Sequence, residues 1–179
     1  MVRVSLMKRA LFSAIVTTLV VLPRGGSWLR AQEGGLAGTS QSTVERVPFD
    51  ATRWTLAWSD EFDRSGAPDP AVWTHEIGQI RNNEEQYYTD RPENARVEDG
   101  RLVIEVRLDR WNGHPITSAS VITAGKKSFL YGRIEVRAKI PTGRGTWPAV
   151  WTLGENIGDR GWPACGEIDI LENVGFDPQ

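Results

Sequence analysis

After Phe49 the sequence alternates between apolar and polar residues with a period of two, and this alternation constrains the fold more than any other feature. Segment 101–108 (RLVIEVRL) places four aliphatic residues on one face, and segment 132–140 (GRIEVRAKI) repeats the pattern. Successive side chains of a strand point to opposite faces, so both segments are expected to be half-buried strands. No stretch of ten or more residues after Phe49 has a convincing helical period.

Five shorter segments are also expected to form strands. They are Trp54–Ser59, Val72–Ile77, Ala119–Thr123, Ala149–Leu153 and Glu167–Glu172. Turn signals such as SGAPDP, NGHP and PTGRG separate the strand candidates. The pattern indicates an all-β fold class, an antiparallel β-sandwich or barrel. The last strand is followed by NVGFDPQ, which is typical of an opening loop, so the chain is expected to be the first half of a longer domain.

The N-terminus is expected to be a targeting segment. Residues 1–31 combine the basic MVRVSLMKR with the uncharged apolar stretch Ala10–Leu22, which is a signal-peptide pattern with its best cleavage position at Ala31. An uncleaved membrane anchor is the alternative, although the stretch is short for a bilayer. Residues 32–48 are small, polar and Gly-rich, as in a flexible leader. The protein is therefore expected to be secreted, extracellular or periplasmic, with no membrane contact after signal removal.

Charge and composition exclude several classes of function. Lys and Arg number 21 against 23 Asp and Glu, a net charge of −2, which gives no footprint for nucleic acid or an anionic membrane. The single cysteine, Cys165, excludes an intramolecular disulfide, and His75 and His114 lack the spacing of zinc ligands. Most of the eight tryptophans are expected in the core, with some left for a cleft, where a flat indole suits a sugar ring.

The stretch GEIDILEN (166–173) places three carboxylates among Ile and Leu. On a strand, Glu167 and Asp169 share a face about 7 Å apart, and Ile168 and Ile170 face the core. Strict alternation sends Glu172 to the core side. Either Glu172 is a surface acid at a strand end, or a β-bulge near Leu171 returns it to the face of the other two.

Three aligned carboxylates suit the cleavage of a glycosidic bond. One acid protonates the leaving oxygen, a second attacks or activates water, and a third tunes the pKa values of its neighbours. Two other interpretations fit the spacing, namely an acidic face on an edge strand and a hard-cation site.

The motif EIDILE resembles the bulged active-site signature E-x-D-x-x-E of glycoside hydrolase family 16. Three further blocks are similar to the family and follow in family order: WSDEFD (58–63), the segment 82–105 from NNEEQYY to LVIE, and the segment 131–154 that contains GTWPAVW. The resemblance covers 49–179 and is strongest to laminarinase-like bacterial endo-β-1,3-glucanases. The extra Leu171 distinguishes the chain from lichenases, whereas agarases and carrageenases share the bulged form.

The resemblance implies a β-jelly roll, truncated after the catalytic strand, so that residues 49–179 are the N-terminal part of the domain. It implies retaining hydrolysis of internal β-1,3-glucosidic bonds of laminarin-type β-glucans, with Glu167 as nucleophile, Glu172 as acid/base and Asp169 as the assisting carboxylate. A non-catalytic β-glucan-binding module and an inactive truncated fragment are the alternatives.

The resemblance also implies ligand contacts. Trp147 and Trp151 match a cleft-lining strand, and strand alternation places them on one face. Asn83 matches a position that hydrogen-bonds sugar. Glu61 and Gly100 match positions of a structural calcium ion, although a further side-chain ligand expected near the C-terminus is absent. No cofactor is expected to be required for catalysis, the expected partner is the polysaccharide substrate, and the expected state is a monomer.

Overall fold

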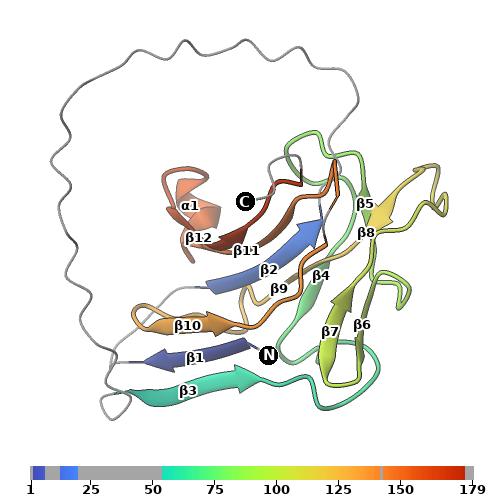
Figure 1. Cartoon of the computed structure of the whole chain (residues 1–179). Helices are drawn as coiled ribbons and strands as arrows, with labels where there is room; N and C mark the ends of the chain where they lie inside the picture. The colour runs from blue at the N-terminus through green and yellow to red at the C-terminus, as the bar shows by residue number, and fades with distance from the viewer. Residues whose placement is uncertain (1, 7–12, 20–53, 142, 176–179) are drawn as a thin grey trace, which may run out of the picture.

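The computed structural model describes residues 2–6, 13–19, 54–141 and 143–175, and nearly all regular structure in these ranges is β (Figure 1). The strands are β1 (Val2–Leu6), β2 (Ser13–Leu19), β3 (Thr55–Asp60), β4 (Thr74–Glu76), β5 (Tyr87–Tyr88), β6 (Ala95–Glu98), β7 (Arg101–Ile104), β8 (Thr117–Ser118), β9 (Ser120–Ile122), β10 (Arg133–Val136), β11 (Pro148–Leu153) and β12 (Glu167–Glu172). A four-residue helix, α1 (Ile157–Arg160), precedes β12. The predicted all-β class is confirmed.

The strands form two larger sheets and two strand pairs. The five-stranded sheet has the order β12-β11-β2-β9-β4, and the three-stranded sheet has the order β10-β1-β3. All neighbours in these sheets are antiparallel, as expected, whereas β5 and β8 pair in parallel. Strands β6 and β7 form a hairpin whose two turn residues, Asp99 and Gly100, have positive φ, as a tight hairpin turn requires.

Each of the seven segments expected to form strands overlaps a strand, although β7 ends at Ile104 and β10 at Val136, four residues before the expected ends. The strands that the sequence pattern missed after Phe49 are β5, β6 and β8, which are only two to four residues long. A strand of two residues, such as β5 or β8, cannot show a period of two.

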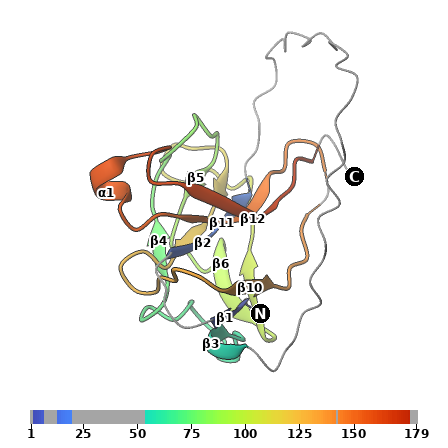
Figure 2. The same cartoon turned by 90° about the vertical axis from the view of Figure 1, so that its left-hand side faces the viewer.

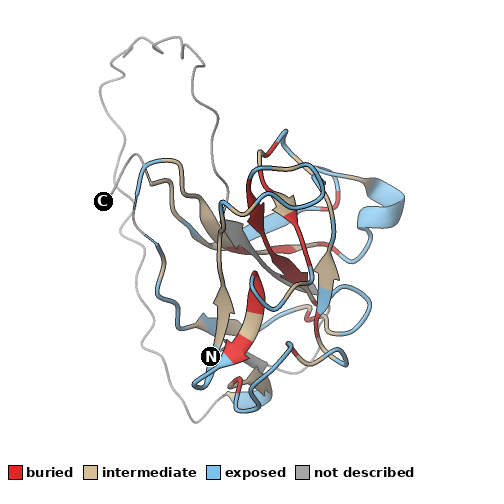
Figure 3. Ribbon diagram, turned by 90° about the vertical axis from the view of Figure 1, so that its right-hand side faces the viewer, coloured by how far each residue is buried: buried red, intermediate tan, exposed pale blue. Residues whose placement is uncertain are grey.

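The hydrophobic core joins side chains from β3, β6, β7, β9 and β10. Its buried members are Phe62, Trp73, Ala95, Val97, Ala119 and Val121. Figure 3 shows burial concentrated on inner strands, with α1 exposed. Among the described tryptophans, only Trp58 and Trp73 contribute to this cluster, with ring centroids 6.1 Å apart. The expectation that most tryptophans lie in the core is therefore wrong for the described residues.

Part of the expected signal peptide forms strands in this structure. Residues 2–6 form β1 between β10 and β3, and residues 13–19 form β2 between β11 and β9. The rest of residues 1–31 and the whole of the expected leader 32–48 lie outside the described residues. In the described part of the chain, no helix has the length and hydropathy to cross a membrane. Cleavage of a signal stays a prediction.

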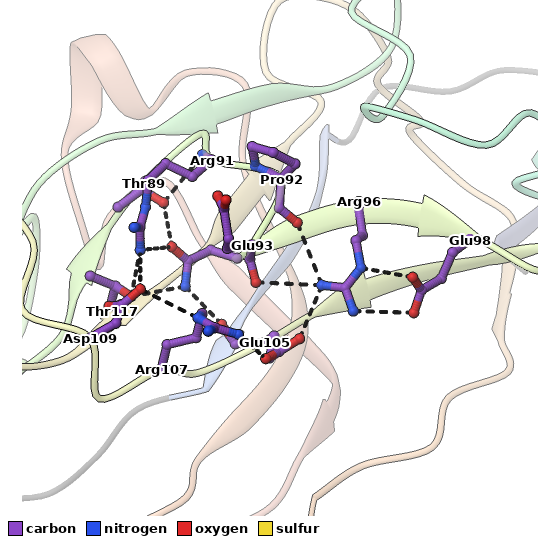
Figure 4. A network of polar contacts seen from close by, with 11 residues as sticks. Thr89, Arg91, Pro92, Glu93, Arg96, Glu98, Glu105, Arg107, Asp109 and Thr117 are labelled. Carbon is purple, nitrogen blue, oxygen red and sulfur yellow. Dashed lines mark hydrogen bonds and ion pairs between the residues drawn. The ribbon is translucent and has the colours of Figure 1, made fainter.

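A network of polar contacts connects β5, β7 and β8 and the segments that follow them (Figure 4). The fully buried Asn94 accepts hydrogen bonds at Oδ1 from Thr89 Oγ1 (2.6 Å) and Arg91 Nη2 (2.9 Å). Its Nδ2 donates to the Glu105 carbonyl (2.9 Å) and to Thr117 Oγ1 (3.0 Å). One side chain thus links the loop after β5 with β8 and with the segment after β7.

We expect Asn94→Ala to lower the free energy of unfolding by about 2–4 kcal/mol, because several buried donors and acceptors lose their partner at once. Urea denaturation measures the change. The adjacent Glu93→Ala, at an exposed position, is the control and is expected to stay within about 0.5 kcal/mol of the parent chain. Equal losses in the two variants would contradict a structural role for Asn94.

Candidate active site

A β-bulge in β12 determines where its acidic side chains point. Strand β12 pairs with β11, and Val150 lies opposite Leu171 whereas the next residue, Trp151, lies opposite Asp169. Ile170 therefore has no partner on β11, which is the geometry of one inserted residue. The bulge expected near Leu171 is confirmed.

The bulge brings the three carboxylates of β12 to one face of the sheet. Glu167 lies opposite Leu153, Asp169 opposite Trp151, and Glu172 opposite Ala149. Every second residue of a strand points to the same face, so residues 149, 151 and 153 share one face of β11. Directly opposed residues of two neighbouring strands also share a face. Glu167, Asp169 and Glu172 consequently line one side of the β11–β12 pair.

The opposite side of β12 differs from the expectation. Ile168 was expected to face the core, but it is 54% exposed. The reason is that β12 is the edge strand of the five-stranded sheet, so few neighbours cover its far side. Its partner on β11, Thr152, is buried.

Each of the two outer acids accepts a hydrogen bond from an indole. Trp147 Nε1 donates to Glu172 Oε1 over 2.8 Å, and Trp162 Nε1 donates to Glu167 Oε2 over 3.0 Å. The donors come from opposite ends of the pair, because Trp147 directly precedes β11 and Trp162 lies in the loop before β12. The two bonds orient both carboxylates, with Asp169 between them in the sequence.

The loop that carries Trp162 joins β11 to β12 and contains α1, which projects from the sheet (Figure 2). It begins at Gly154, where a Cβ would lie 2.2 Å from the carbonyl oxygen of Cys165, and ends at Gly166, whose φ is +81°. The Gly154 N–H donates to the Gly166 carbonyl over 3.2 Å. A side chain at position 154 would clash with the backbone, and the φ at position 166 favours glycine, so both ends of the loop that carries Trp162 depend on glycine.

Partial burial and neighbouring charge raise the pKa of Glu167 above the ordinary glutamate value. Loss of solvation is the largest cause, and the negative charge of Asp169 adds to it. The hydrogen bond from Trp162 acts in the opposite direction, as does the positive charge of Arg81, while Glu172 raises the pKa. The net result is that Glu167 holds its proton to a higher pH than an ordinary glutamate does.

The structure places the expected sugar contacts at different distances from the acids. Trp151 is half-buried opposite Asp169, and Trp147 contacts Glu172 directly. Asn83 is exposed, with a φ of 53°, in the turn between β4 and β5. Arg81, two residues earlier, lies over the Trp151 ring, so this turn lies against the site. Sugar binding by these residues stays a prediction.

Glu61 and Gly100, the expected calcium ligands, line one groove. Calcium takes roughly six to eight oxygen ligands. Within the described ranges, no group of three or more His, Cys, Asp or Glu side chains is arranged to hold a metal. Calcium at this place stays a prediction.

Comparison with known proteins adds the family. The model described as "Glycosyl hydrolases family 16" matches residues 82–179, more than half of the chain, including β11 and β12. The chain belongs to glycosyl hydrolases family 16. The expected family is confirmed, and the three acids of β12 lie within the matched residues.

Individual proteins and a solved structure are also similar to this family 16 chain. It is 53% identical over 133 residues to the "Beta-glucanase" of Rhodothermus marinus, covering 72% of this chain and 46% of that protein. The X-ray structure of the laminarinase from Rhodothermus marinus superposes with a TM-score of 0.66 at 53% identity, covering 70% of this chain and 52% of that one. The "Beta-1,3-glucan-binding protein" of Penaeus monodon is 53% identical over 64 residues, covering 36% of this chain and 18% of that protein. The chain spans about half the length of the Rhodothermus marinus β-glucanase and of the laminarinase structure, whose jelly-roll fold it shares.

Sequence reasoning missed three polar residues of the site. Trp162 lies five residues before Glu167, and its loop position gave it no face by alternation. Arg81 directly precedes the NNEEQYY motif, and its ion-pair partner Glu76 accepts a hydrogen bond from Ser120, 44 residues away in the sequence. Their contacts depend on tertiary structure, and periodicity carries no signal for them.

We expect Trp162→Phe to raise the pKa of Glu167 further, because the variant keeps an aromatic ring but removes the N–H that favours the ionised carboxylate. A ¹³C NMR titration of the glutamate carboxyl carbons measures the midpoint. Trp147→Phe is the matched control, since it removes the same group from Glu172, and its effect on the Glu167 midpoint should be smaller. An unchanged midpoint in Trp162→Phe would contradict the assignment of this hydrogen bond.

Proposed function

We propose that the protein hydrolyses internal β-1,3-glucosidic bonds of laminarin-type β-glucans with retention of anomeric configuration. The observation that carries the proposal is the placement of Glu167, Asp169 and Glu172 on one face by the bulge of β12. Membership of family 16 and the similarity to a β-glucanase and a laminarinase support the substrate class.

In the proposed reaction, Glu167 attacks the anomeric carbon while Glu172 protonates the leaving glycosidic oxygen. A covalent glycosyl-enzyme forms on Glu167. Glu172, now ionised, removes a proton from water, which attacks the same carbon and releases the sugar with its original configuration. The Trp147 N–H fixes Glu172 at the side from which the proton is delivered.

Asp169 acts on Glu167 through charge. Its carboxylate raises the pKa of Glu167, which makes the ionised Glu167 a more basic and stronger nucleophile in the first step. Glu167 must be ionised to attack, so the acidic limb of kcat/KM should lie above the ordinary pKa of glutamate. The chemistry uses side chains of this chain and is proposed to need no cofactor.

We expect Glu167→Gln and Glu172→Gln each to abolish the release of reducing ends from laminarin, a loss of at least about a thousandfold, because each removes one of the two required carboxylates. Glu155→Gln is the matched control, since Glu155 is exposed in the loop after β11 and should retain the parent rate. Parent-level activity in either active-site variant would refute the assignment.

A non-catalytic β-glucan-binding module is the second candidate, and the similarity to the Penaeus monodon protein favours it. The two functions differ in one measurement. Laminarin that binds with no release of reducing ends would support binding alone. Glu167 and Glu172 each accept a hydrogen bond from a tryptophan, which orients both carboxylates. This favours catalysis, because binding a neutral sugar does not require two oriented carboxylates.

We propose that the protein is exported and acts as a monomer, on the basis of its N-terminal basic and apolar pattern and of a site built within one chain. Cleavage after Ala31 would remove β1 and β2 from the two sheets. N-terminal sequencing of the protein from the culture medium or periplasm is expected to begin at Gln32. Exported protein that still begins near Met1 would contradict cleavage and would mean that both strands are retained.

A further inference from the structure

A charged cluster that the proposed reaction does not use lies on the same face of the five-stranded sheet as the acids of β12. Glu76 of β4 is the cross-strand partner of Ser120 of β9. In the uncleaved chain, whose residues 13–19 form β2, the register continues through residue 17 of β2 to Ala149 and Glu172. Because directly opposed residues share a face, Glu76 and Glu172 occupy the two ends of one row across the sheet.

Arg81 connects this row with the tryptophan of the site. Its Nη2 donates to Glu76 Oε2 in an ion pair, and the Ser120 hydroxyl donates to the same oxygen. The guanidinium carbon lies 5.4 Å from the centre of the Trp151 ring and 5.8 Å from that of the Tyr88 ring. The side chains of Arg81 and Glu76 retain only 21% and 22% of their exposure, so the cation is held in place rather than free in solvent.

We propose that Arg81 is a positioning residue of the site: it holds the indole plane of Trp151 for a sugar ring, and it brings a positive charge, paired with Glu76, to the sheet face that carries the acids of β12. The first role rests on the proposed function. The second needs only the arrangement of charges and holds whether or not laminarin is the substrate.

The charges around the site determine the direction in which Arg81 and Glu76 shift the ionisation of Glu167. The acidic groups around Glu167 and Arg81 are Asp169 and Glu172 from β12, Glu76 from β4 and Glu84 from the turn before β5. Arg81 opposes this negative charge and lowers the pKa of both Glu167 and Glu84. Removing Arg81 should make Glu167 harder to ionise, whereas removing the charge of Glu76 should make it easier.

The indole N–H of Trp162 provides a direct probe, because it donates to Glu167 Oε2 and its NMR signal reports the ionisation of that carboxylate. We would titrate the full-length protein labelled with ¹⁵N-tryptophan, assigning the signal with Trp162→Phe. The Trp162 midpoint is expected to move to higher pH in Arg81→Met, to lower pH in Glu76→Gln, and to stay near the parent value in Arg81→Lys. Arg101→Met, which removes an exposed arginine on β7, is the matched control and should leave the midpoint unchanged.

The affinity for sugar tests the positioning of Trp151 separately from the electrostatic role of Arg81. Both Arg81→Met and Arg81→Lys are expected to raise the KM for laminarin about two- to fivefold, because Met has no cation to stack on Trp151 and the ammonium of Lys lacks the planar fork. An unshifted midpoint in Arg81→Met, or shifts of the same sign in Arg81→Met and Glu76→Gln, would overturn the electrostatic role. An unchanged KM in Arg81→Lys would overturn the positioning of Trp151. The titration needs no turnover, so it tests Arg81 even if laminarin is not hydrolysed.

Discussion

The bulge at Ile170 is the constraint on which the site depends. Without this unpaired residue, strict alternation would direct Glu172 to the other side of β12, away from Glu167 and Asp169. In a regular strand, residues on the face of Glu167 are two and four positions after it. With one bulge residue in between, the residue five positions after it, Glu172, returns to that face. The bulged form also leaves Leu171 opposite the buried Val150, so the packing side of the strand keeps its own contacts.

Three carboxylates on one face repel one another, and the surroundings offset this repulsion at specific atoms. Indole N–H groups bind the two outer acids, and Arg81 supplies positive charge from the neighbouring turn. The raised pKa of Glu167 is the net result of partial burial and of these opposing contributions. The loop before β12 and the turn before β5 therefore belong to the site as much as β12 itself does.

Periodicity and local turn chemistry predicted most of the framework. The longer strands and the shared face of Glu167 and Asp169 follow from spacing along a single segment. Spacing left two positions open for Glu172, and the resemblance to the bulged family signature pointed to the bulge that the structure contains. The contacts of Trp162, Arg81 and Glu76 depend on how distant segments meet, which no local pattern encodes. The pairing of residues 2–6 and 13–19 with the sheets was also unexpected, since their basic and apolar character is typical of a targeting segment.

The most direct test of this account is covalent trapping. A 2-deoxy-2-fluoro-laminaribiosyl fluoride forms its glycosyl-enzyme quickly and releases it slowly, so the labelled residue is identified by peptide mass spectrometry. The account predicts one label, on Glu167, and no label in Glu167→Gln. A label on Glu172 or Asp169, or unlabelled protein that still hydrolyses laminarin, would contradict a retaining mechanism with Glu167 as the nucleophile.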